Sequence, residues 1–425
     1  MKSLHVVLLA PLLLLLPGRA QDFRPRPFDW PQWQGPDRNN TSREAGLLQS
    51  WPKDGPRLVW KANLLGGGYS VPSVAAGRII GMSYLGEDEI VWALEASKGK
   101  LLWKTPIAKA NRTVDYNEGS RCSPTIEGDA LYALGVDGDL VCLRVADGAF
   151  VWRRNLVKDF DGILPFYIAS YGYTESPLID GDRVVVTPGG TKATVVALDK
   201  KTGKTIWTVA IPEPRKMGSS RAAYASLVAS EVDGVKHYVQ FLQGGLVGVS
   251  REGKLLWRWD TPSNDIANCT TPIVHQNLVF ASSGYGKGCG LARLVPKKDE
   301  LHVDELYFNK AMKNVHGGMV LVDGYVYGNS DPGYLVCLEL AAGKVKWQER
   351  AAGRGSIVYA DGHLYYRDEA GPMLLVEANP EKYIEKGRFS PPGRSKVKAW
   401  SHPVIANGHM LLRDQEALCC YDIKR

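Results

Sequence analysis

The sequence has few cysteines and histidines, and neither residue type is spaced for metal or haem binding. The 425 residues include seven cysteines and eight histidines. C-x-x-C, C-x-x-C-H and H-E-x-x-H patterns are absent, which gives no support to the usual dithiol, c-type haem and zinc-protease sites. The odd cysteine count argues against a complete disulfide framework. We expect buried thiols that pack as small apolar residues.

Blocks of like charge and long apolar runs are also missing after the N-terminus. The formal net charge of +7 is spread along the chain, so nucleic-acid binding has little support. No later segment is apolar enough to span a bilayer. A mildly basic chain of this kind is compatible with a protein or glycan partner.

Residues 1–20 are the exception, because they combine a basic start at Lys2 with an apolar run that ends before Ala20. This pattern predicts a secretory signal that is cleaved after Ala20. The run is short for a membrane anchor and is interrupted by Pro11. No cysteine follows it, so a lipoprotein anchor is not indicated. We expect a secreted or periplasmic protein.

Glycine and tryptophan are abundant (45 and 12 residues), and they recur together in a repeated pattern. Two apolar residues, a small residue and another apolar residue are followed by a glycine and then a tryptophan. The small residue stands ten positions before the tryptophan each time. The clearest copies are VWALEASKGKLLW (91–103), LVCLRVADGAFVW (140–152), VVALDKKTGKTIW (195–207) and LVCLELAAGKVKW (335–347).

Each copy follows a second hairpin pattern, so each unit is predicted to hold four antiparallel strands. The predicted fold is all-β: an eight-bladed β-propeller over residues 58–425, with the last blade closed by an N-terminal strand. Residues 21–57 would form an arm that packs on the propeller. Closure within one chain favours a monomer. The outer-strand aromatic positions are Trp60, Trp103, Trp152, Trp207, Trp257, Phe308, Trp347 and Phe389.

The segment ALDKKTGKTIW (197–207) resembles the repeat of the pyrroloquinoline quinone (PQQ) propeller superfamily at every specified position. That superfamily includes quinoprotein dehydrogenases and the outer-membrane assembly factor BamB, which has the propeller without the cofactor. The opening DWPQWQGPDRNN (29–40) is similar to exported bacterial PQQ-repeat proteins, which are abundant in planctomycete-type genomes. The resemblance implies the fold but leaves the function open.

Ligand-binding residues are expected at one mouth of the central channel, just before the innermost strands. Three arginines there would suit an anionic ligand, although the same charges could equally pair with one another. The predicted mouth residues are Glu118, Arg121, Tyr171, Tyr173, Glu175, Arg221, Tyr224, Asn268, His316, Arg354, Trp400 and His402.

Three functions follow from these features. The first is a binding or scaffold module with a BamB-like architecture. The second is a PQQ- and calcium-dependent oxidoreductase that acts on an alcohol or sugar, in which Glu175 and Asn268 would help to hold calcium. The third is carbohydrate binding through Trp30, Trp33 and the mouth tyrosines. The adjacent Cys419 and Cys420 imitate the vicinal disulfide of the enzymes, but their frame predicts a core strand.

Overall fold

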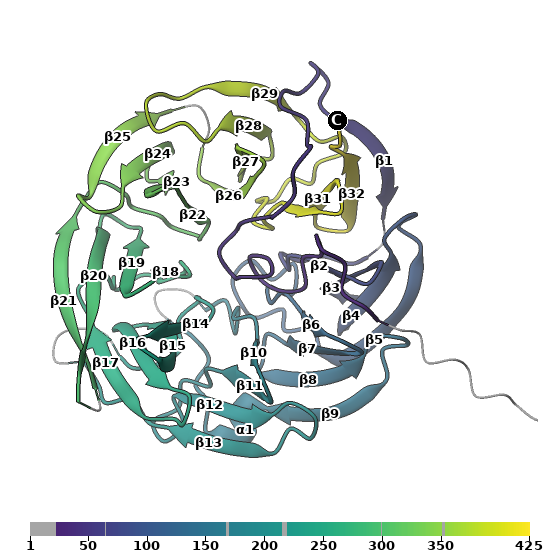
Figure 1. The fold of residues 1–425 in the computed structure, drawn as a ribbon. Helices are drawn as coiled ribbons and strands as arrows, with labels where there is room; N and C mark the ends of the chain where they lie inside the picture. The colour runs from purple at the N-terminus through teal and green to yellow at the C-terminus, as the bar shows by residue number, and fades with distance from the viewer. Residues whose placement is uncertain (1–22, 64, 167–169, 215–218, 299, 351–352) are drawn as a thin grey trace, which may run out of the picture.

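The protein is a closed ring of eight four-stranded antiparallel sheets (Figure 1). This computed structural model describes residues 23–425 except 64, 167–169, 215–218, 299 and 351–352. Within each sheet the chain runs from the channel to the circumference. The eight-bladed propeller predicted from the repeats is therefore confirmed.

The first four blades follow one another along the chain. Blade 1 contains β2 (Ser73–Ala75), β3 (Arg78–Leu85), β4 (Asp88–Glu95) and β5 (Leu101–Lys109). Blade 2 contains β6 (Thr125–Glu127), β7 (Ala130–Leu134), β8 (Asp139–Arg144) and β9 (Phe150–Asn155). A short helix, α1 (Leu156–Phe160), follows. Blade 3 contains β10 (Leu178–Asp180), β11 (Arg183–Val186), β12 (Val195–Asp199) and β13 (Thr205–Val209). Blade 4 contains β14 (Val228–Val232), β15 (Val235–Leu242), β16 (Gly245–Ser250) and β17 (Leu255–Trp259).

The remaining blades complete the ring. Blade 5 contains β18 (Ile273–His275), β19 (Leu278–Ser283), β20 (Gly288–Lys297) and β21 (Glu300–Asn309). Blade 6 contains β22 (Met319–Val322), β23 (Tyr325–Ser330), β24 (Tyr334–Glu339) and β25 (Lys344–Glu349). Blade 7 contains β26 (Gly355–Ala360), β27 (His363–Asp368), β28 (Met373–Glu377) and β29 (Glu385–Phe389). Blade 8 contains β30 (Val404–Ala406), β31 (His409–Asp414), β32 (Ala417–Asp422) and the N-terminal β1 (Arg57–Ala62).

Ring closure depends on the pairing of β1 with β32, two strands from opposite ends of the chain. They run antiparallel, with Trp60 opposite Cys420, and lie side by side at the edge of the ring (Figure 1). The pairing gives blade 8 its fourth strand and covers an edge that would otherwise be open. The predicted closure by an N-terminal strand is confirmed.

The repeated tryptophan joins each blade to the next through the glycine turn of the neighbour. Trp152 of blade 2 donates its indole N–H to the Lys200 carbonyl of blade 3 (2.9 Å). A Cβ atom at Gly203, where φ is +69°, would lie 2.8 Å from the Trp152 ring. A side chain at that position would therefore clash with the indole. The glycine thus allows the positive φ of the turn and also leaves room for the tryptophan of the preceding blade.

The same contact recurs around the ring. Equivalent indole hydrogen bonds run from Trp60 to Ala96, Trp103 to Val145, Trp207 to Arg251 and Trp347 to Asn379. The outer strand of every blade is bulged beside this position, as in blade 3, where Ile206 of β13 is the extra residue opposite Ala197 and Leu198 of β12. A bulge bends the strand and re-aims a side chain. Here it accompanies the turn of the ring toward the next blade.

Blades 4, 5 and 7 differ from the predicted aromatic pattern. In blade 4, Trp257 has no hydrogen-bond partner among the described residues, and Trp259 instead donates to Glu305 of blade 5 (2.7 Å). In blade 5, Tyr307 rather than Phe308 contacts the next blade, through the Leu340 carbonyl.

In blade 7 the predicted Phe389 is two residues out of place. Gly387 occupies the repeat position opposite Leu375. A Cβ atom at Gly387 would lie 2.6 Å from the Cβ atom of Trp51, which belongs to the N-terminal arm. Trp51 of the arm therefore supplies the aromatic side chain that blade 7 lacks at this position. Phe389 packs edge-on against Tyr421 of blade 8, with 5.2 Å between ring centroids.

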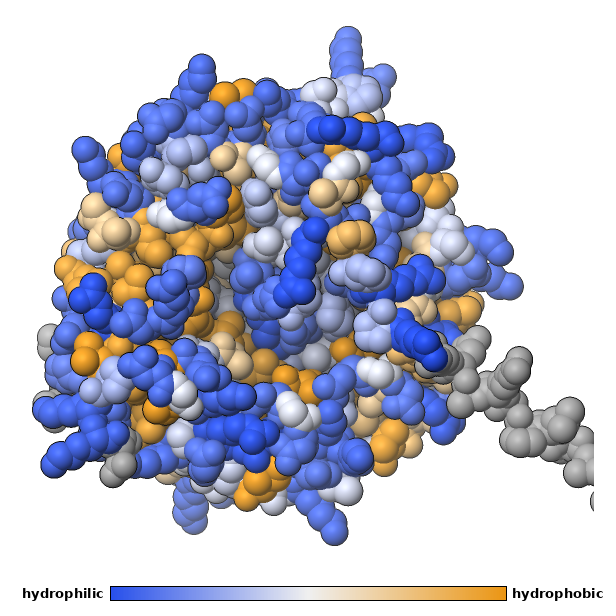
Figure 2. All heavy atoms as spheres, in the orientation of Figure 1, coloured by the Kyte–Doolittle hydropathy of each residue, from blue (hydrophilic) through white to orange (hydrophobic). Residues whose placement is uncertain are grey.

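The arm, residues 23–56, crosses one end of the channel (Figure 1). Its Trp30 pairs through the backbone with Val74 of β2 and is only 1% exposed. Its Arg38 is buried and donates to the carbonyls of Ser176 and Pro177 (2.8 and 3.0 Å). Figure 2 shows this face, with hydrophilic arm residues over the centre of the ring. The arm thus fills the channel from the end opposite the predicted mouth.

We predict that Trp152→Ala lowers the free energy of unfolding by about 3–5 kcal/mol, because a large inter-blade contact is lost. Trp152→Phe keeps an aromatic ring but loses the bond to the Lys200 carbonyl, so it should cost about 1 kcal/mol from that bond. Equilibrium urea denaturation measures both. Equal, small losses in the two variants would contradict this role for the indole.

Candidate functional site: the aromatic mouth

Five aromatic rings form a continuous surface at the channel end that the arm leaves free. Tyr69 lies 5.0 Å from Trp400, which lies 4.6 Å from Tyr116. Tyr116 lies 6.0 Å from Tyr171, and Tyr171 lies 5.0 Å from Tyr224, all between ring centroids. These spacings are typical of tilted aromatic pairs. We call Tyr69, Tyr116, Tyr171, Tyr224 and Trp400 the aromatic mouth.

The rings differ in exposure, which defines the surface that a partner can reach. Tyr116 is 44% exposed, and Tyr171 and Trp400 are partly exposed. Tyr69 and Tyr224 are buried behind them. The accessible part of the mouth therefore consists of Tyr116, Tyr171 and Trp400.

Arg121 supports these rings from within. Its guanidinium lies 5.4 Å from the Tyr69 ring centre and 5.5 Å from that of Tyr171. It also donates to the backbone carbonyls of Asp115 and Tyr116 (2.7 Å each) and of Tyr171 (3.1 Å). These bonds hold the Tyr116 loop against the ring. Arg121 therefore positions the aromatic mouth.

A second polar cluster fixes Trp400. Glu369, in the turn after β27, accepts from the Trp400 indole (3.1 Å) and from Lys398 Nζ (2.8 Å). His316 Nε2 lies 3.5 Å from the same carboxylate. Burial alone would raise the pKa of Glu369, but the neighbouring His316, Lys398 and Trp400 side chains hold it down to about 2. The carboxylate is thus charged and anchors Trp400.

The charges at the mouth are largely neutralised within the protein. Arg354 forms an ion pair with Asp331 (2.6 Å), and Glu118 accepts from the Tyr69 hydroxyl (2.7 Å). Arg221 is exposed and remains available. The three-arginine arrangement expected for an anionic ligand is therefore not assembled.

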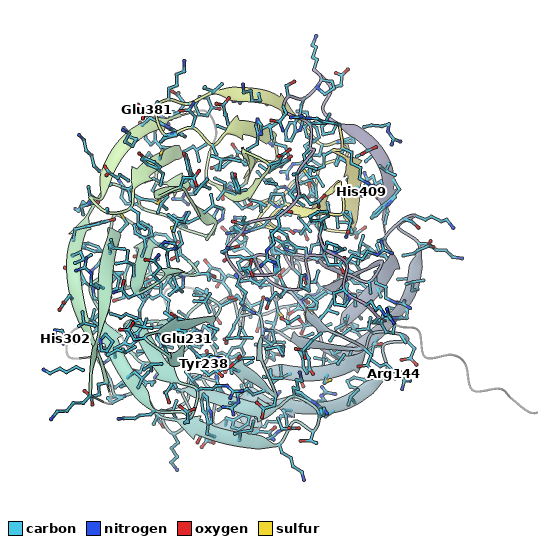
Figure 3. The ribbon with its side chains drawn as sticks, in the orientation of Figure 1. Arg144, Glu231, Tyr238, His302, Glu381 and His409 are labelled. Carbon is cyan, nitrogen blue, oxygen red and sulfur yellow. The ribbon has the colours of Figure 1, made fainter. Side chains whose placement is uncertain are left out.

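Charged groups at the outer circumference are also paired locally. Arg144 pairs with Asp147 (2.5 Å), His302 lies 3.2 Å from Asp304, and the Glu381 carboxylate lies 3.6 Å from Lys346. Arg144, His302 and Glu381 all lie at the edge of the ring, far from its centre (Figure 3). The circumference therefore presents a mixed, paired surface.

Four predicted mouth residues lie behind the surface. Tyr173 is 1% exposed and donates to the Pro188 carbonyl (2.7 Å). His402 is buried against Trp33 of the arm, 4.7 Å between ring centroids. Burial and the neighbouring His316 lower the pKa of His402 to about 3, so the ring is neutral. The other two residues, Glu175 and Asn268, are the proposed calcium ligands.

Glu175 and Asn268 are each satisfied inside the fold. Glu175 accepts from the Thr187 N–H (2.9 Å) and hydroxyl (3.1 Å) and is 2% exposed. Asn268 accepts from the Asn264 N–H (3.0 Å) and donates to the Gln243 carbonyl (2.9 Å), with no exposed surface. Their polar groups serve the inner strands and loops, so neither side chain is free to face a cofactor in the channel.

The described residues do not fit a calcium–PQQ site. Nowhere in the described part of the chain do three or more His, Cys, Asp or Glu side chains gather to hold a metal ion. Cys419 and Cys420 are buried free thiols in β32. The predicted core role of this cysteine pair is confirmed. We therefore derive no quinone chemistry from this site.

The arm tryptophans also do not present a sugar-binding platform. Trp30 is almost fully buried between blades 1 and 8. Trp33 donates its indole N–H to Thr271 (2.9 Å) and packs on His402. Both indoles are engaged in fixing the arm.

Two residues important to the mouth were missed from the sequence. Tyr116 lies in the loop between blades 1 and 2, and Glu369 lies in a turn within blade 7. Neither immediately precedes an innermost strand, although the predicted Glu118 lies in the same loop as Tyr116. The length of the loop between Lys109 and Thr125 was the available signal for Tyr116.

Comparison with known proteins resolves the family. A family model described as outer membrane protein assembly factor BamB matches residues 40–163 and 118–349, more than half of the sequence. The chain belongs to this family. BamB of Salmonella typhimurium is 26% identical over 185 residues, which are 42% of this chain and 41% of that protein. BamB of Escherichia coli is 23% identical over 207 residues, 44% of this chain and 47% of that protein. The matches thus span less than half the length of these relatives.

Solved structures agree with the fold. BamB from Moraxella catarrhalis superposes with a TM-score of 0.63 at 15% identity, covering 87% of this chain and all of that one. Quinohemoprotein alcohol dehydrogenase from Comamonas testosteroni gives a TM-score of 0.62 at 12% identity, covering 93% of this chain and 81% of that one. At these identities the likeness establishes the propeller alone.

The predicted signal, residues 1–20, lies outside the described residues. Within the described residues, no helix is long and apolar enough to cross a membrane.

We predict that Glu175→Gln is tolerated and makes stability less dependent on pH. Burial raises the pKa of Glu175 from 4.5 to about 8, despite the Thr187 bonds and the charge of Arg38. A raised carboxyl pKa means that the folded protein binds the proton more tightly, so stability falls as pH rises from about 4.5 to about 8. Glutamine removes this loss.

Thermal unfolding between pH 5 and pH 9 measures the difference. The exposed Glu300→Gln serves as the matched control and should follow the wild-type curve. A Glu175→Gln protein that fails to fold at pH 5, where the wild-type carboxyl is protonated, would contradict this account.

Proposed function

We propose that this protein is an exported binding module that holds a polypeptide segment of a partner protein at the aromatic mouth. Residues 1–20 would act as the cleaved export signal, and residues 21–57 as an arm that closes the opposite end of the channel. The observation that carries the proposal is the continuous surface of Tyr116, Tyr171 and Trp400 on a fixed support. Secretion or a periplasmic location follows from the export signal.

The chemistry of the mouth favours a protein partner. Exposed tyrosine and tryptophan rings give large contact areas at low entropic cost and are enriched in interface hot spots. The tyrosine hydroxyls also suit hydrogen bonds with peptide backbone. The support beneath them is held by Arg121 and Glu369, so little ordering is required on binding.

The family supports a scaffold role rather than catalysis. The matched relatives are named for outer membrane protein assembly. The quinoprotein neighbours share the fold, but Glu175 and Asn268 are committed to internal hydrogen bonds here. We expect a ring that closes within one chain to act as a monomer.

The test is to pan a random peptide library against the purified mature protein and to measure the enriched peptides by calorimetry. We expect micromolar binding that Tyr116→Ser weakens at least tenfold, because an exposed contact ring is lost. Phe150→Ser removes an equally exposed ring (47%) from outer strand β9 and should leave binding unchanged.

Enriched peptides that bind Tyr116→Ser and Trp400→Ala as tightly as wild type would place the site elsewhere. Retention on a polysaccharide column that Trp400→Ala abolishes, without any peptide binding, would favour a glycan ligand instead.

A further inference from the structure

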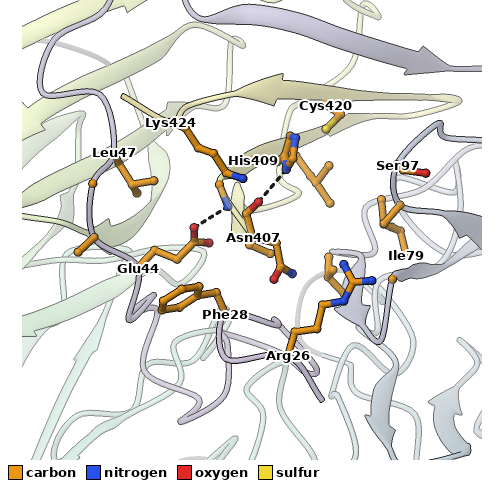
Figure 4. A pocket seen from close by; sticks show the side chains of 18 of the residues that line it. Arg26, Phe28, Glu44, Leu47, Ile79, Ser97, Asn407, His409, Cys420 and Lys424 are labelled. Atoms are coloured by element: carbon orange, nitrogen blue, oxygen red, sulfur yellow. Dashed lines mark hydrogen bonds between the residues drawn. The ribbon is translucent and has the colours of Figure 1, made fainter. Parts of the chain in front are cut away.

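A cavity lies on the arm side of the ring, away from the aromatic mouth. It has a volume of about 610 Å³, opens to the surface, and is lined by the arm and by the turns of blades 1 and 8 (Figure 4). This volume lies in the range that small-molecule sites occupy. Neither the aromatic mouth nor the proposed scaffold role uses this cavity.

The floor of the cavity is apolar. Leu47 of the arm, Val74 and Ile79 of blade 1, and Leu411 and Cys420 of blade 8 line it, and all are buried. A ligand with a hydrocarbon or aromatic body would bury its surface here, and removing that surface from water favours binding.

Glu44 places one unsatisfied polar atom in this wall. Its side chain is 6% exposed, and Oε2 accepts from the Gly408 N–H. Oε1 is buried and has no hydrogen-bond partner among the described residues. In Figure 4 the carboxyl group points into the space near Phe28, Asn407 and Lys424. An unpaired buried oxygen is costly, so a partner from a ligand would be favourable.

Two cations flank the cavity without partners of their own. The side chains of Arg26 and Lys424 are exposed and form no ion pair or hydrogen bond with a described residue. Burial raises the pKa of Glu44 to about 7, although the Gly408 and Asn407 amides and Lys424 oppose the shift. Glu44 therefore carries its proton in a large share of molecules at neutral pH. The rim is then positively charged, and Oε1 can donate.

We propose that this cavity binds a carboxylate on an apolar body. Lys424 and Arg26 would hold the carboxylate by charge-assisted hydrogen bonds, and the Glu44 carboxylic acid would donate to it. The apolar body would lie against the floor. A free aliphatic or aromatic acid and the C-terminal residue of a peptide both present this chemistry.

The two sources are separated by the probes. Calorimetric titration would use octanoate, octanol as the uncharged analogue, and the dipeptide acetyl-Ala-Leu with a free or amidated C-terminus. We expect octanoate or the free-acid peptide to bind, and octanol and the amide to bind at least tenfold more weakly. Octanoate alone indicates a free acid, and the peptide alone indicates a protein C-terminus.

Lys424→Met should weaken binding at least tenfold, whereas Lys53→Met, an exposed arm lysine outside the cavity, should have no effect. Wild-type affinity should fall as pH rises from 6 to 8.5, because Glu44 loses its proton. Glu44→Gln should remove that dependence. The other ionisable residues that line the cavity are Arg26, His409, Cys420, Lys424 and Arg425. His409→Gln is the control for the histidine of the cavity, and this variant should retain the wild-type pH dependence because Glu44 is still present.

No binding of octanoate or of the free-acid peptide at millimolar concentration would overturn the proposal. So would binding that Lys424→Met leaves unchanged in a folded protein. Tyr116→Ser should not alter octanoate binding, so failure here is distinguishable from failure of the aromatic mouth.

Discussion

The structure depends on one repeated contact, the aromatic side chain of one blade seated on the glycine turn of the next. A four-stranded sheet cannot bury both faces alone, so each blade needs a neighbour on each side. The indole supplies apolar area and one hydrogen bond, while the absent glycine side chain leaves room for it. Repeating this contact, together with the β1–β32 pairing, produces a closed ring whose two ends are free to differ.

The two ends of the ring are built differently. At one end the arm enters the channel, where Arg38 and Trp33 bond to residues just before the innermost strands β10 and β18. At the other end Arg121 and Glu369 hold aromatic rings at the surface. The same fold is found in quinoprotein enzymes. In this chain, however, Glu175 and Asn268 of the inner loops form hydrogen bonds within the protein.

The sequence predicted the fold closely because the blade contact is local and periodic. Ala197, Gly203 and Trp207 fall within one hairpin, so their spacing survives in the chain as a readable pattern. The prediction was one residue off in blade 5, where Tyr307 and not Phe308 stands opposite Leu291 beside the bulge, because the long β20–β21 hairpin does not keep the ten-residue spacing of the other blades. In blade 7 the ring comes from Trp51, which no repeat pattern contains.

The candidate site was predicted less completely. Residues before the innermost strands do surround the mouth, as Trp400 and Arg121 show. Whether such a residue faces the channel or the core depends on tertiary packing, however. Glu175 and Asn268 are buried in the core. Tyr116 and Glu369 come from loops whose paths no local pattern specifies.

We expect this propeller to bind its partner through the aromatic mouth and not to hold a quinone. The most direct measurement is a titration of the mature protein with PQQ, with and without calcium, followed by absorbance and thermal shift. We expect no saturable, calcium-dependent stabilisation of the protein at high micromolar PQQ. Saturable, calcium-dependent stabilisation that Glu175→Gln weakens would contradict it.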